Sequence, residues 1–263
     1  MSAAPAPTVT PELRQVLRRL KLGKMLDTLP ERLLLAKHNQ LGHAAFLELV
    51  LADEIDRRDR TGAAQRARAA GLDRAMTLQT WQDHDHITYD HDTFAELATL
   101  GFVEANHSAL ILGPVGVGKT HLAHALGHVA CRRRMRVHAD RSDRLFKRLK
   151  ASRLDNSHAH EMRRLIAVDL LLIDDFALHP LDATATADFY ELIVERHATA
   201  SMLITSNREP NEWLGQLADP LLAQSALDRL QSCAYELVIE GESYRRRQKP
   251  TITTHTTTNR KDP

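Results

Sequence analysis

The sequence has few cysteines, little net charge and no long apolar run, and each of these absences excludes a class of protein. Its only two cysteines, Cys131 and Cys233, lie far apart and form no metal-type spacing, which excludes a cysteine-based metal module and fits a reducing compartment. A net charge of only +1 excludes a chain whose overall field attracts nucleic acid, so any such role depends on local clusters. No apolar run approaches the length that spans a bilayer, and the N-terminus carries no secretory signal. We therefore expect a soluble, cytoplasmic protein without a membrane partner.

Composition and periodicity divide the chain into segments. Residues 1–10 are rich in Pro, Ala and Thr, and residues 249–263 have too little apolar surface to fold, so we expect both to be disordered. Apolar residues recur every three or four positions from Pro11 to about Ala70, which predicts an all-helical N-terminal domain over 11–79. A linker follows over 80–94.

The remainder, residues 95–248, has a different pattern in which short apolar runs alternate with helical stretches. This pattern is typical of an α/β domain with a parallel sheet covered on both faces. The chain contains enough such runs for a five-stranded sheet. The predicted strands are residues 109–112, 136–139, 169–173, 202–205 and 235–239.

The predicted linker contains alternating histidines and aspartates. In "TWQDHDHITYDHDTF" (80–94), His84 and His86 alternate with Asp83 and Asp85. Alternation places both histidines on one side of an extended chain, but no third ligand follows at a fixed spacing. We therefore interpret the stretch as a linker and not as a metal site.

A glycine-rich motif follows the first predicted strand. The stretch "GPVGVGKTHLAHALG" matches G-x-x-x-x-G-K-[S/T], the loop whose backbone N–H groups surround phosphates at the start of a helix. Lys119 would lie between the β and γ phosphates, and the Thr120 hydroxyl would bind Mg²⁺. Because the motif follows a strand and opens an amphipathic helix, it predicts an ATP site with Mg²⁺. The predicted ATP-binding residues are Gly113, Pro114, Val115, Gly116, Val117, Gly118, Lys119, Thr120 and His121.

Two adjacent aspartates end the third apolar run, "LLLIDD". Like charges at the end of a buried strand are unfavourable unless a cation or a reaction compensates for them. Asp174 is placed to hold Mg²⁺ opposite Thr120, as the acidic residue of a Walker B strand does. Asp175 is a candidate general base for the attacking water, although aspartate is also a common residue in turns.

Two polar residues of interest lie between the fourth and fifth runs. Asn207, in "ITSNREPNEW", lies at the tip of a strand that we expect between the Walker A and Walker B strands, where its amide can orient a water molecule. Its alternative role is to form the turn before Pro210. Arg229, in "LDRLQS", has no partner of opposite charge on its own helix face. It is either an arginine finger for a neighbouring subunit or a surface residue.

Two clusters of basic residues are candidates for binding a DNA backbone. One lies at the end of the N-terminal domain and the other on the helix that follows the second predicted strand. Each cluster can equally be a solvated helix face. The candidate DNA-binding residues are Arg57, Arg58, Arg66, Arg68, Arg144, Lys147, Arg148 and Lys150.

Taken in order, "GPVGVGKTHLAHALG", "LLLIDDFA", "ITSNREPNEW", "LDRL" and "GESYR" resemble the IstB-like ATP-binding proteins of bacterial insertion sequences, relatives of the DnaC helicase loaders. The helical stretches "LKLGKMLDTLPERL" and "NQLGHAAFLELVLADEIDRR" are also similar, so the resemblance covers about residues 12–247. It implies an AAA+ ATPase that assembles on duplex DNA in its ATP state, with little sequence specificity, and delivers target DNA to a transposase.

The resemblance also implies roles for particular residues. It assigns the finger role to Arg229, which requires a homo-oligomer with nucleotide at the subunit interfaces, and a DNA-facing role to the helices between the second strand and Walker B. Asp175 departs from the Glu of most AAA+ enzymes. The usual helical lid is expected to be absent or vestigial, and Arg245 is the nearest candidate for its sensor arginine.

Two other functions remain open at this point. A replicative helicase loader of the DnaC type would have a helicase as its partner. A small-molecule P-loop kinase would make a phosphorylated product, but Asn207, Arg229 and the lack of an evident acceptor-binding lid argue against it.

Overall fold

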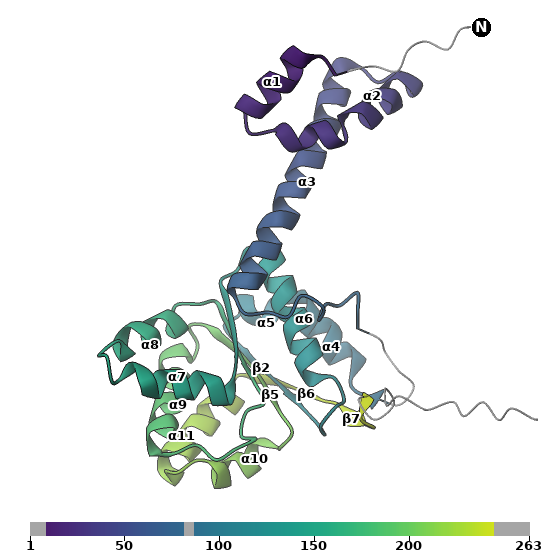
Figure 1. Ribbon diagram of the computed structural model, residues 1–263. Coiled ribbons are helices and arrows are strands. Elements are labelled where there is room, and N and C mark those ends of the chain that lie inside the picture. Colours follow the sequence, from purple (N-terminus) through teal and green to yellow (C-terminus); the bar gives the residue numbers. More distant parts are fainter. Residues whose placement is uncertain (1–8, 82–86, 245–263) are drawn as a thin grey trace, which may run out of the picture. The chain divides into compact units, whose positions relative to one another are not determined.

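The computed structural model describes residues 9–81 and 87–244 (Figure 1). The chain forms two compact units, which divide between Arg66 and Ala67. Each unit has a hydrophobic core of its own, and the two are described in turn.

The first unit is entirely helical, as the apolar periodicity predicts. Its elements are α1 (Pro11–Arg19), the 3₁₀ helix η1 (Gly23–Asp27), α2 (Leu29–His38) and the greater part of α3 (His43–Ala69). Its small core contains Val9, Leu17, Met25, Leu29 and Val50. Thr10 begins α1 by accepting a hydrogen bond from the N–H of Leu13, which satisfies one of the free donors at the helix start. No helix in the described part of the chain is both long and apolar enough to cross a membrane.

The second unit is built on a parallel five-stranded sheet with the order β3-β4-β5-β2-β6. Its strands are β2 (Ser108–Leu112), β3 (Val137–Arg141), β4 (Leu170–Asp174), β5 (Ser201–Ser206) and β6 (Ala234–Val238). The predicted α/β class and the five strands are confirmed. Strand β3 extends two residues beyond its apolar run because Asp140 and Arg141 continue the pairing with β4.

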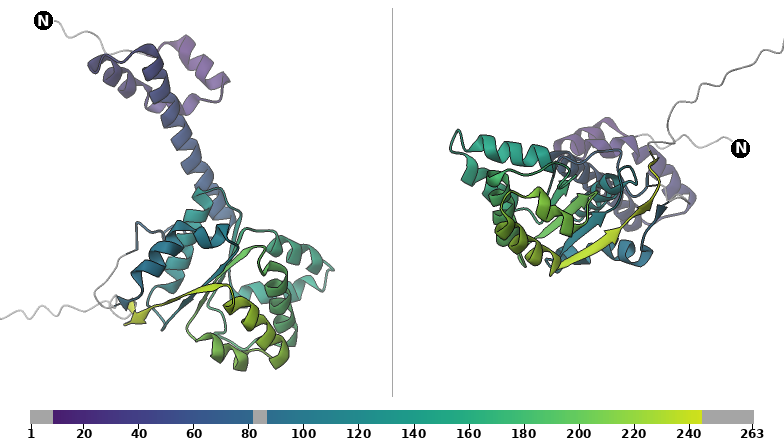
Figure 2. Two further views of the ribbon diagram at one scale, coloured as in Figure 1. Left: turned by 180° about the vertical axis from the view of Figure 1, so that it is seen from behind. Right: turned by 90° about the horizontal axis from the view of Figure 1, so that it is seen from below.

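Helices cover both faces of the sheet, as Figure 2 shows. Strand residues alternate between the faces: Ala109 and Ile111 pack in one core, and Leu110 and Leu112 in the other. The first face is covered by α4 (His91–Thr99), α5 (Gly101–Glu104) and α6 (Lys119–Arg132). The second is covered by α7 (Ser142–Ser152), α8 (His158–Ile166), α9 (Ala183–Arg196), α10 (Pro210–Trp213) and α11 (Pro220–Gln231), and the 3₁₀ helix η2 (Leu214–Gln216) connects the last two.

The boundary between the two units, after Arg66, lies earlier in the chain than the predicted domain boundary at residue 79. Ala67, Ala70 and Leu72 lie in the core of the second unit, and the carbonyl of Ala70 accepts a hydrogen bond from the N–H of Ala139 at 2.7 Å. The described part of the predicted linker also has regular structure. Strand β1 (Ile87–Thr88) pairs antiparallel with β7 (Glu240–Gly241), and α4 begins at His91. Helical periodicity does not reveal these contacts, because their partners are distant in the sequence.

A buried arginine fixes the amino ends of β4 and β5. The side chain of Arg196, at the end of α9, is only 1% exposed. It donates hydrogen bonds to the carbonyls of Leu165, Ile166 and Val168 at 2.8–3.0 Å, and to that of Ser201 at 2.5 Å. Burial lowers the pKa of Arg196 to about 10, so the guanidinium stays charged at neutral pH. It therefore satisfies the last carbonyls of α8 while joining them to the start of β5.

We expect Arg196→Leu to lower the free energy of unfolding by about 3 kcal/mol, because several buried carbonyls lose their donors. Urea unfolding followed by circular dichroism measures the change. Arg163→Leu is a matched control, since Arg163 is exposed on α8, and it should stay within about 0.5 kcal/mol of the parent protein. Equal effects of the two substitutions would contradict the role of Arg196.

Candidate nucleotide-binding site

The predicted glycine-rich loop connects β2 to α6 at the carboxyl edge of the sheet. Gly113 has a φ of 141°, and a Cβ there would lie 2.0 Å from the carbonyl oxygen of Ile239. Gly118 has a φ of 100°, and a Cβ there would lie 2.5 Å from the ring of Trp81. A side chain is thus excluded at both positions by backbone conformation and by space. The loop adopts the shape in which backbone N–H groups at a helix start can surround phosphate.

The lysine of the motif lies within this loop. Lys119 is the first residue of α6 and is 6% exposed. Its Nζ donates to the carbonyl oxygens of Gly113 and Pro114, each at 2.7 Å. The ammonium group is therefore directed across the loop, where it can meet phosphate oxygens.

The two aspartates at the end of β4 are fixed by Thr205 of the neighbouring strand β5. The Oδ1 atom of Asp174 accepts hydrogen bonds from the hydroxyl of Thr120 at 2.9 Å and from that of Thr205 at 2.5 Å. The Thr205 Oγ1 atom in turn accepts the backbone N–H of Asp175 at 3.0 Å. Asp174 and Thr205 are buried. Thr120 and Asp174, the predicted metal pair, thus lie in direct contact, and Thr205 links them to Asp175.

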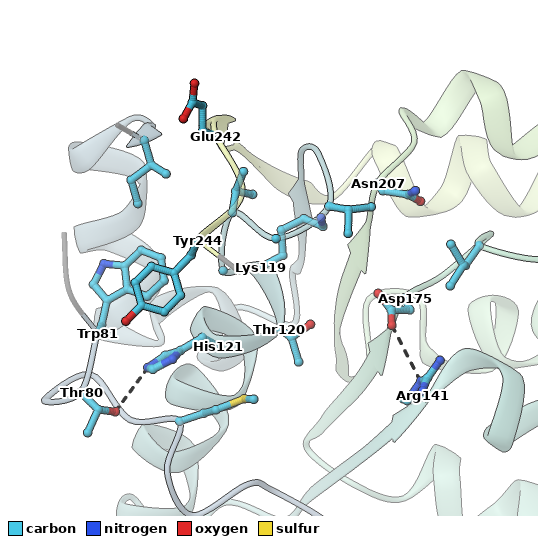
Figure 3. Close-up of a pocket in the computed structure, with 17 residues that line it drawn as sticks. Thr80, Trp81, Lys119, Thr120, His121, Arg141, Asp175, Asn207, Glu242 and Tyr244 are labelled. Atoms are coloured by element: carbon cyan, nitrogen blue, oxygen red, sulfur yellow. Dashed lines mark hydrogen bonds and ion pairs between the residues drawn. The ribbon is translucent and has the colours of Figure 1, made fainter. Parts of the chain in front are cut away.

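Asp175 and Asn207 both line one cavity with the glycine-rich loop (Figure 3). Asp175 has a φ of 53°, and its Oδ2 atom lies 3.8 Å from Nε of Arg141. Asn207 follows β5, which lies between β2 and β4 in the sheet. The strand expected between Walker A and Walker B is therefore present, and it places Asn207 and the two aspartates at the same edge.

The cavity has a volume of about 600 Å³, which is enough for a nucleotide. One part of it is formed by the glycine-rich loop and the polar residues described above. Another is formed by Met76, Trp81, Ile87 and Tyr244, whose apolar and aromatic side chains suit a planar base. The backbone N–H of Tyr244 donates to the carbonyl of Gly116 at 2.9 Å, which holds this residue against the loop.

Sequence reasoning missed Trp81, Tyr244, Thr205 and Arg141. Trp81 falls in the stretch interpreted as a linker, and Tyr244 lies in the similar "GESYR" stretch without a role assigned. A lone aromatic residue beside a linker is the signal that could have identified Trp81. The contacts of Thr205 and Arg141 arise only from strand pairing, which local sequence does not contain.

His121, predicted to bind ATP, contacts the segment that precedes β1. Its Nε2 atom lies 3.0 Å from the carbonyl oxygen of Thr77 and 3.3 Å from Oγ1 of Thr80. Its ring is 5.4 Å from that of Trp81 in an edge-on arrangement. On the next turn of α6, burial lowers the pKa of His124, although the charges of Asp174 and Asp73 act in the opposite direction. His121 therefore shapes the base side of the cavity by positioning residues 77–81.

Arg229 does not line this cavity. Its guanidinium donates to the carbonyl of Ser225 at 2.9 Å and lies 5.9 Å from the ring centre of Tyr190. It lines a small cleft with Ser108 and Cys233, which are at the amino edge of β2 and before β6. The glycine-rich loop is at the opposite, carboxyl edge. Arg229 is thus not part of the nucleotide site of its own chain.

Most of the predicted DNA-binding residues contact carboxylates. Glu54 accepts hydrogen bonds from Arg57 and Arg58. These bonds, chiefly the one from Arg57, lower the pKa of Glu54 to about 2. Buried Asp140 accepts from Arg144 and Arg148, and Asp182 accepts from Lys150. Arg66 also interacts with another group and is partly buried. Among the described residues we find no ion pair for Arg68 or Lys147.

Some sequence predictions fall outside the described residues. These are the sensor candidate Arg245, the histidines and aspartates of 83–86, the tail over 249–263 and most of the segment 1–10. Within residues 9–81 and 87–244, we find no group of three or more His, Cys, Asp or Glu side chains that could hold a metal ion.

We expect Thr205→Val to lower the free energy of unfolding of the second unit by about 2 kcal/mol. Valine keeps the shape of threonine but removes a hydroxyl that donates to a buried carboxylate and accepts a backbone N–H. Thr199→Val is the control, because Thr199 is exposed and its hydroxyl contacts only the carbonyl of Glu195. If urea unfolding gave the two variants equal stability, Thr205 would not hold the site together.

Comparison with known proteins identifies relatives along almost the whole chain. The model of the IstB-like ATP binding protein family matches residues 15–251. An ATP-binding protein of an insertion sequence from Mycobacterium tuberculosis is 38% identical over 245 residues, which cover 93% of this chain and 98% of the relative. An ATP-binding protein of insertion sequence IS21 from Pseudomonas aeruginosa is 33% identical, with 90% of each chain covered.

Solved structures share the fold at lower identity. The replication initiator DnaA bound to AMPPCP and single-stranded DNA superimposes with a TM-score of 0.52 at 21% identity, over 65% of this chain and 51% of that one. This chain thus spans about half the length of DnaA. The DnaC helicase loader gives a TM-score of 0.52 at 16% identity, over 63% of this chain and 97% of the loader. The chain has an AAA+ P-loop fold and belongs to the IstB-like ATP binding protein family.

Proposed function

We propose that this protein is an ATPase that assembles on duplex DNA in its ATP state and assists the transposase of an insertion sequence in selecting target DNA. The observation that carries the proposal is the alignment of the glycine-rich loop, Asp174, Asp175 and Asn207 at one edge of the sheet. The relatives of this chain are ATP-binding proteins of insertion sequences, which supports a role in transposition over one in helicase loading.

The residues present fit ATP and Mg²⁺. The positive φ angles of the loop glycines and the placement of Lys119 suit a triphosphate. Thr120 and Asp174, which share a hydrogen bond of 2.9 Å, would hold Mg²⁺. When bound, this ion would neutralise charge on the phosphate oxygens. The apolar part of the cavity around Trp81 and Tyr244 would hold the base.

The two residues beyond the metal pair would act on water. Asp175 lines the cavity with a half-exposed carboxylate that can accept a proton from an attacking water molecule. Asn207 can both donate and accept hydrogen bonds, so it can orient that water toward the phosphate. In this reaction water accepts the phosphoryl group, so no second substrate is needed. The reaction of a small-molecule kinase requires such a substrate.

Arg229 would complete the site of a second copy of the chain. It lies at the edge of the sheet opposite to the glycine-rich loop, so it cannot reach the nucleotide of its own subunit. Subunits packed with the amino edge of one against the carboxyl edge of the next would bring Arg229 to a γ-phosphate. We therefore propose a homo-oligomer with nucleotide between subunits.

The DNA contacts would be few and not specific for sequence. Arg57, Arg58, Arg144, Arg148 and Lys150 each contact a carboxylate, so they present less free charge than a count of basic residues implies. Lys147 and Arg68 retain more of their charge for contact with DNA. A surface of this kind can attract a phosphate backbone when many copies line up along DNA, which fits binding that depends on assembly.

We expect Lys119→Ala to abolish ATP-dependent assembly on random-sequence duplex DNA, because the triphosphate loses its main cation. Asp175→Asn should still assemble but hydrolyse ATP at least about tenfold more slowly, because it removes only the base. Sedimentation or mass photometry with and without ATP measures assembly, and phosphate release measures hydrolysis. The multimer should dissociate as salt rises.

Two results would count against the proposal. If no multimer formed with DNA and ATP at low salt, the assembly on DNA would be wrong. If Asp175→Asn lost nucleotide binding and hydrolysis equally, Asp175 would hold the nucleotide and would not be the base.

We expect Arg229→Ala to bind ATP normally but to hydrolyse it slowly, and mixing it with Asp175→Asn should restore activity. In a mixed oligomer, one subunit supplies the intact Asp175 and its neighbour supplies the intact Arg229. With random mixing at equal amounts, about a quarter of the interfaces would be complete. The control is a mixture of Arg229→Ala with the double variant that carries both substitutions, which contains no complete interface. Equal rates in the two mixtures would show that Arg229 does not act between subunits.

A further inference from the structure

Residues 70–81, which we call the strap, run along helix α6 to the nucleotide cavity without a helix or strand of their own. Near its start, Leu72 packs so closely on Gly127 of α6 that a Cβ at this glycine would lie 2.8 Å from the leucine side chain. At its end, the ring of Trp81 lies against Gly118 of the glycine-rich loop and lines the cavity. The strap thus connects the core of the second unit to the base side of the cavity.

Three histidines of α6 contact the backbone of the strap. His121, His124 and His128 are spaced by three and four residues, which places them on one face of the helix. The Nδ1 atom of His124 accepts the N–H of Asp73 at 2.9 Å, and Nε2 of His128 lies 2.8 Å from the carbonyl oxygen of the same residue. Nε2 of His121 lies 3.0 Å from the carbonyl oxygen of Thr77. The strap is therefore attached to α6 at successive turns of the helix.

The two histidines at Asp73 have opposite roles in hydrogen bonding. His124 accepts an N–H, so its Nδ1 atom carries no proton and its ring is neutral. His128 faces a carbonyl, which can only accept, so its Nε2 atom carries a proton. Burial lowers the pKa of His124, which favours the neutral ring that this contact requires. Both backbone groups of Asp73 are thus satisfied by imidazoles, as a segment outside helices and sheets requires.

We propose that His124 and His128 are positioning residues that hold the strap on α6, and so keep Trp81 at the base side of the cavity before ATP binds. The inference rests on the proposed function, in which this part of the cavity holds the base. Because α6 begins with Lys119 and Thr120, the same helix then fixes the contacts to phosphate and to the base. A wall that is already in place need not be ordered when the nucleotide binds, which raises affinity.

Release of the strap would affect two ligands differently. ATP affinity falls in proportion to the fraction of free protein in which the strap is docked, because ATP needs the base side of the cavity. Inorganic triphosphate has no base or ribose and contacts only the glycine-rich loop, so its affinity does not depend on the strap. Saturating ATP docks the strap again, so the rate of hydrolysis at saturation is kept. The two histidines therefore act on affinity for the base and not on rate.

The test is the affinity of the full-length protein for ATP and for inorganic triphosphate, each with Mg²⁺, measured by calorimetry. His124→Leu and His128→Leu should each weaken ATP binding about fivefold, the effect expected from the loss of one hydrogen bond. Triphosphate affinity, and the hydrolysis rate at saturating ATP, should change by less than about twofold. Equal weakening of both ligands, or a lower rate at saturation, would show that the histidines support the loop or the whole fold, and would overturn the inference.

The matched control is His160→Leu, because His160 is exposed on α8. This substitution removes an imidazole from a helix without touching the strap, and it should change neither affinity. A fivefold loss of ATP affinity in the control would show that any loss of a histidine has this effect, which would also overturn the inference.

Amide substitutions provide a second readout, because asparagine and glutamine replace different imidazole nitrogens. The amide of asparagine is at the distance of Nδ1 from the backbone, and that of glutamine is at the distance of Nε2. His124→Asn and His128→Gln should therefore keep ATP affinity within about twofold of the parent protein. The exchanged variants, His124→Gln and His128→Asn, should bind ATP as weakly as the leucine variants. Equal affinities in all four would show that the contacts with Asp73 are not the cause.

Fluorescence reports the position of the strap directly. The chain has two tryptophans, and Trp213 is fully buried in the core, so a spectral change belongs to Trp81. In His124→Leu without ATP, the emission should move to longer wavelength as Trp81 becomes exposed to water. It should return toward that of the parent protein at saturating ATP. An unchanged spectrum without ATP would show that the strap stays docked and that His124 does not hold it.

The parent protein separates this inference from the proposed function. If it bound ATP no more tightly than inorganic triphosphate, the base would contribute nothing to affinity, and the inference alone would be wrong. If it bound neither ligand, the proposed nucleotide site and the inference would both be wrong.

Discussion

The hydroxyl of Thr205 is the contact on which the geometry of the candidate site depends. It donates to Asp174 and accepts the N–H of Asp175, so one buried group fixes both aspartates relative to strand β5. Asn207 lies two residues further along the same chain. Because Asp174 also accepts from Thr120, the contact reaches the glycine-rich loop. Strands β4 and β5 and the start of helix α6 are therefore joined by hydrogen bonds that involve side chains, in addition to the backbone pairing of the sheet.

The sequence predicted the features that depend on local pattern. The alternation of apolar runs and helices indicated the sheet, and a motif of fixed spacing indicated the loop around Lys119. Asp174 and Asn207 could be placed at the carboxyl edge of the sheet because Asp174 ends one strand and Asn207 follows another. Thr205 and Arg141 were not identified, since their roles depend on which strands are neighbours. Trp81 was missed because it lies in a stretch without periodicity that was interpreted as a linker. In the structure its ring lies against Gly118 of the glycine-rich loop.

Charge counting was less informative than strand prediction. Arg144 and Arg148 form a basic stripe in the sequence, yet both donate to buried Asp140, and Lys150 donates to Asp182, which is 32 residues away. Asp182 cannot be assigned to this cluster before the fold is known, whereas Asp140 precedes Arg144 by only four residues. These arginines and this lysine therefore stabilise the packing of α7 as well as adding to its surface charge, and a substitution that removes one of them would affect both properties.

The left-handed backbone at Asp175 bears on why an aspartate occupies this position, where most AAA+ enzymes have glutamate. At a φ of 53°, aspartate, asparagine and glycine are tolerated better than residues with longer side chains, because a short polar group can bond to the local backbone. Asparagine and glycine lack a carboxylate. For the proposed role as the base, aspartate meets both the conformational and the chemical requirement, although its side chain is shorter than that of glutamate. Selection at this position would then reflect the shape of the main chain as much as the chemistry of water attack.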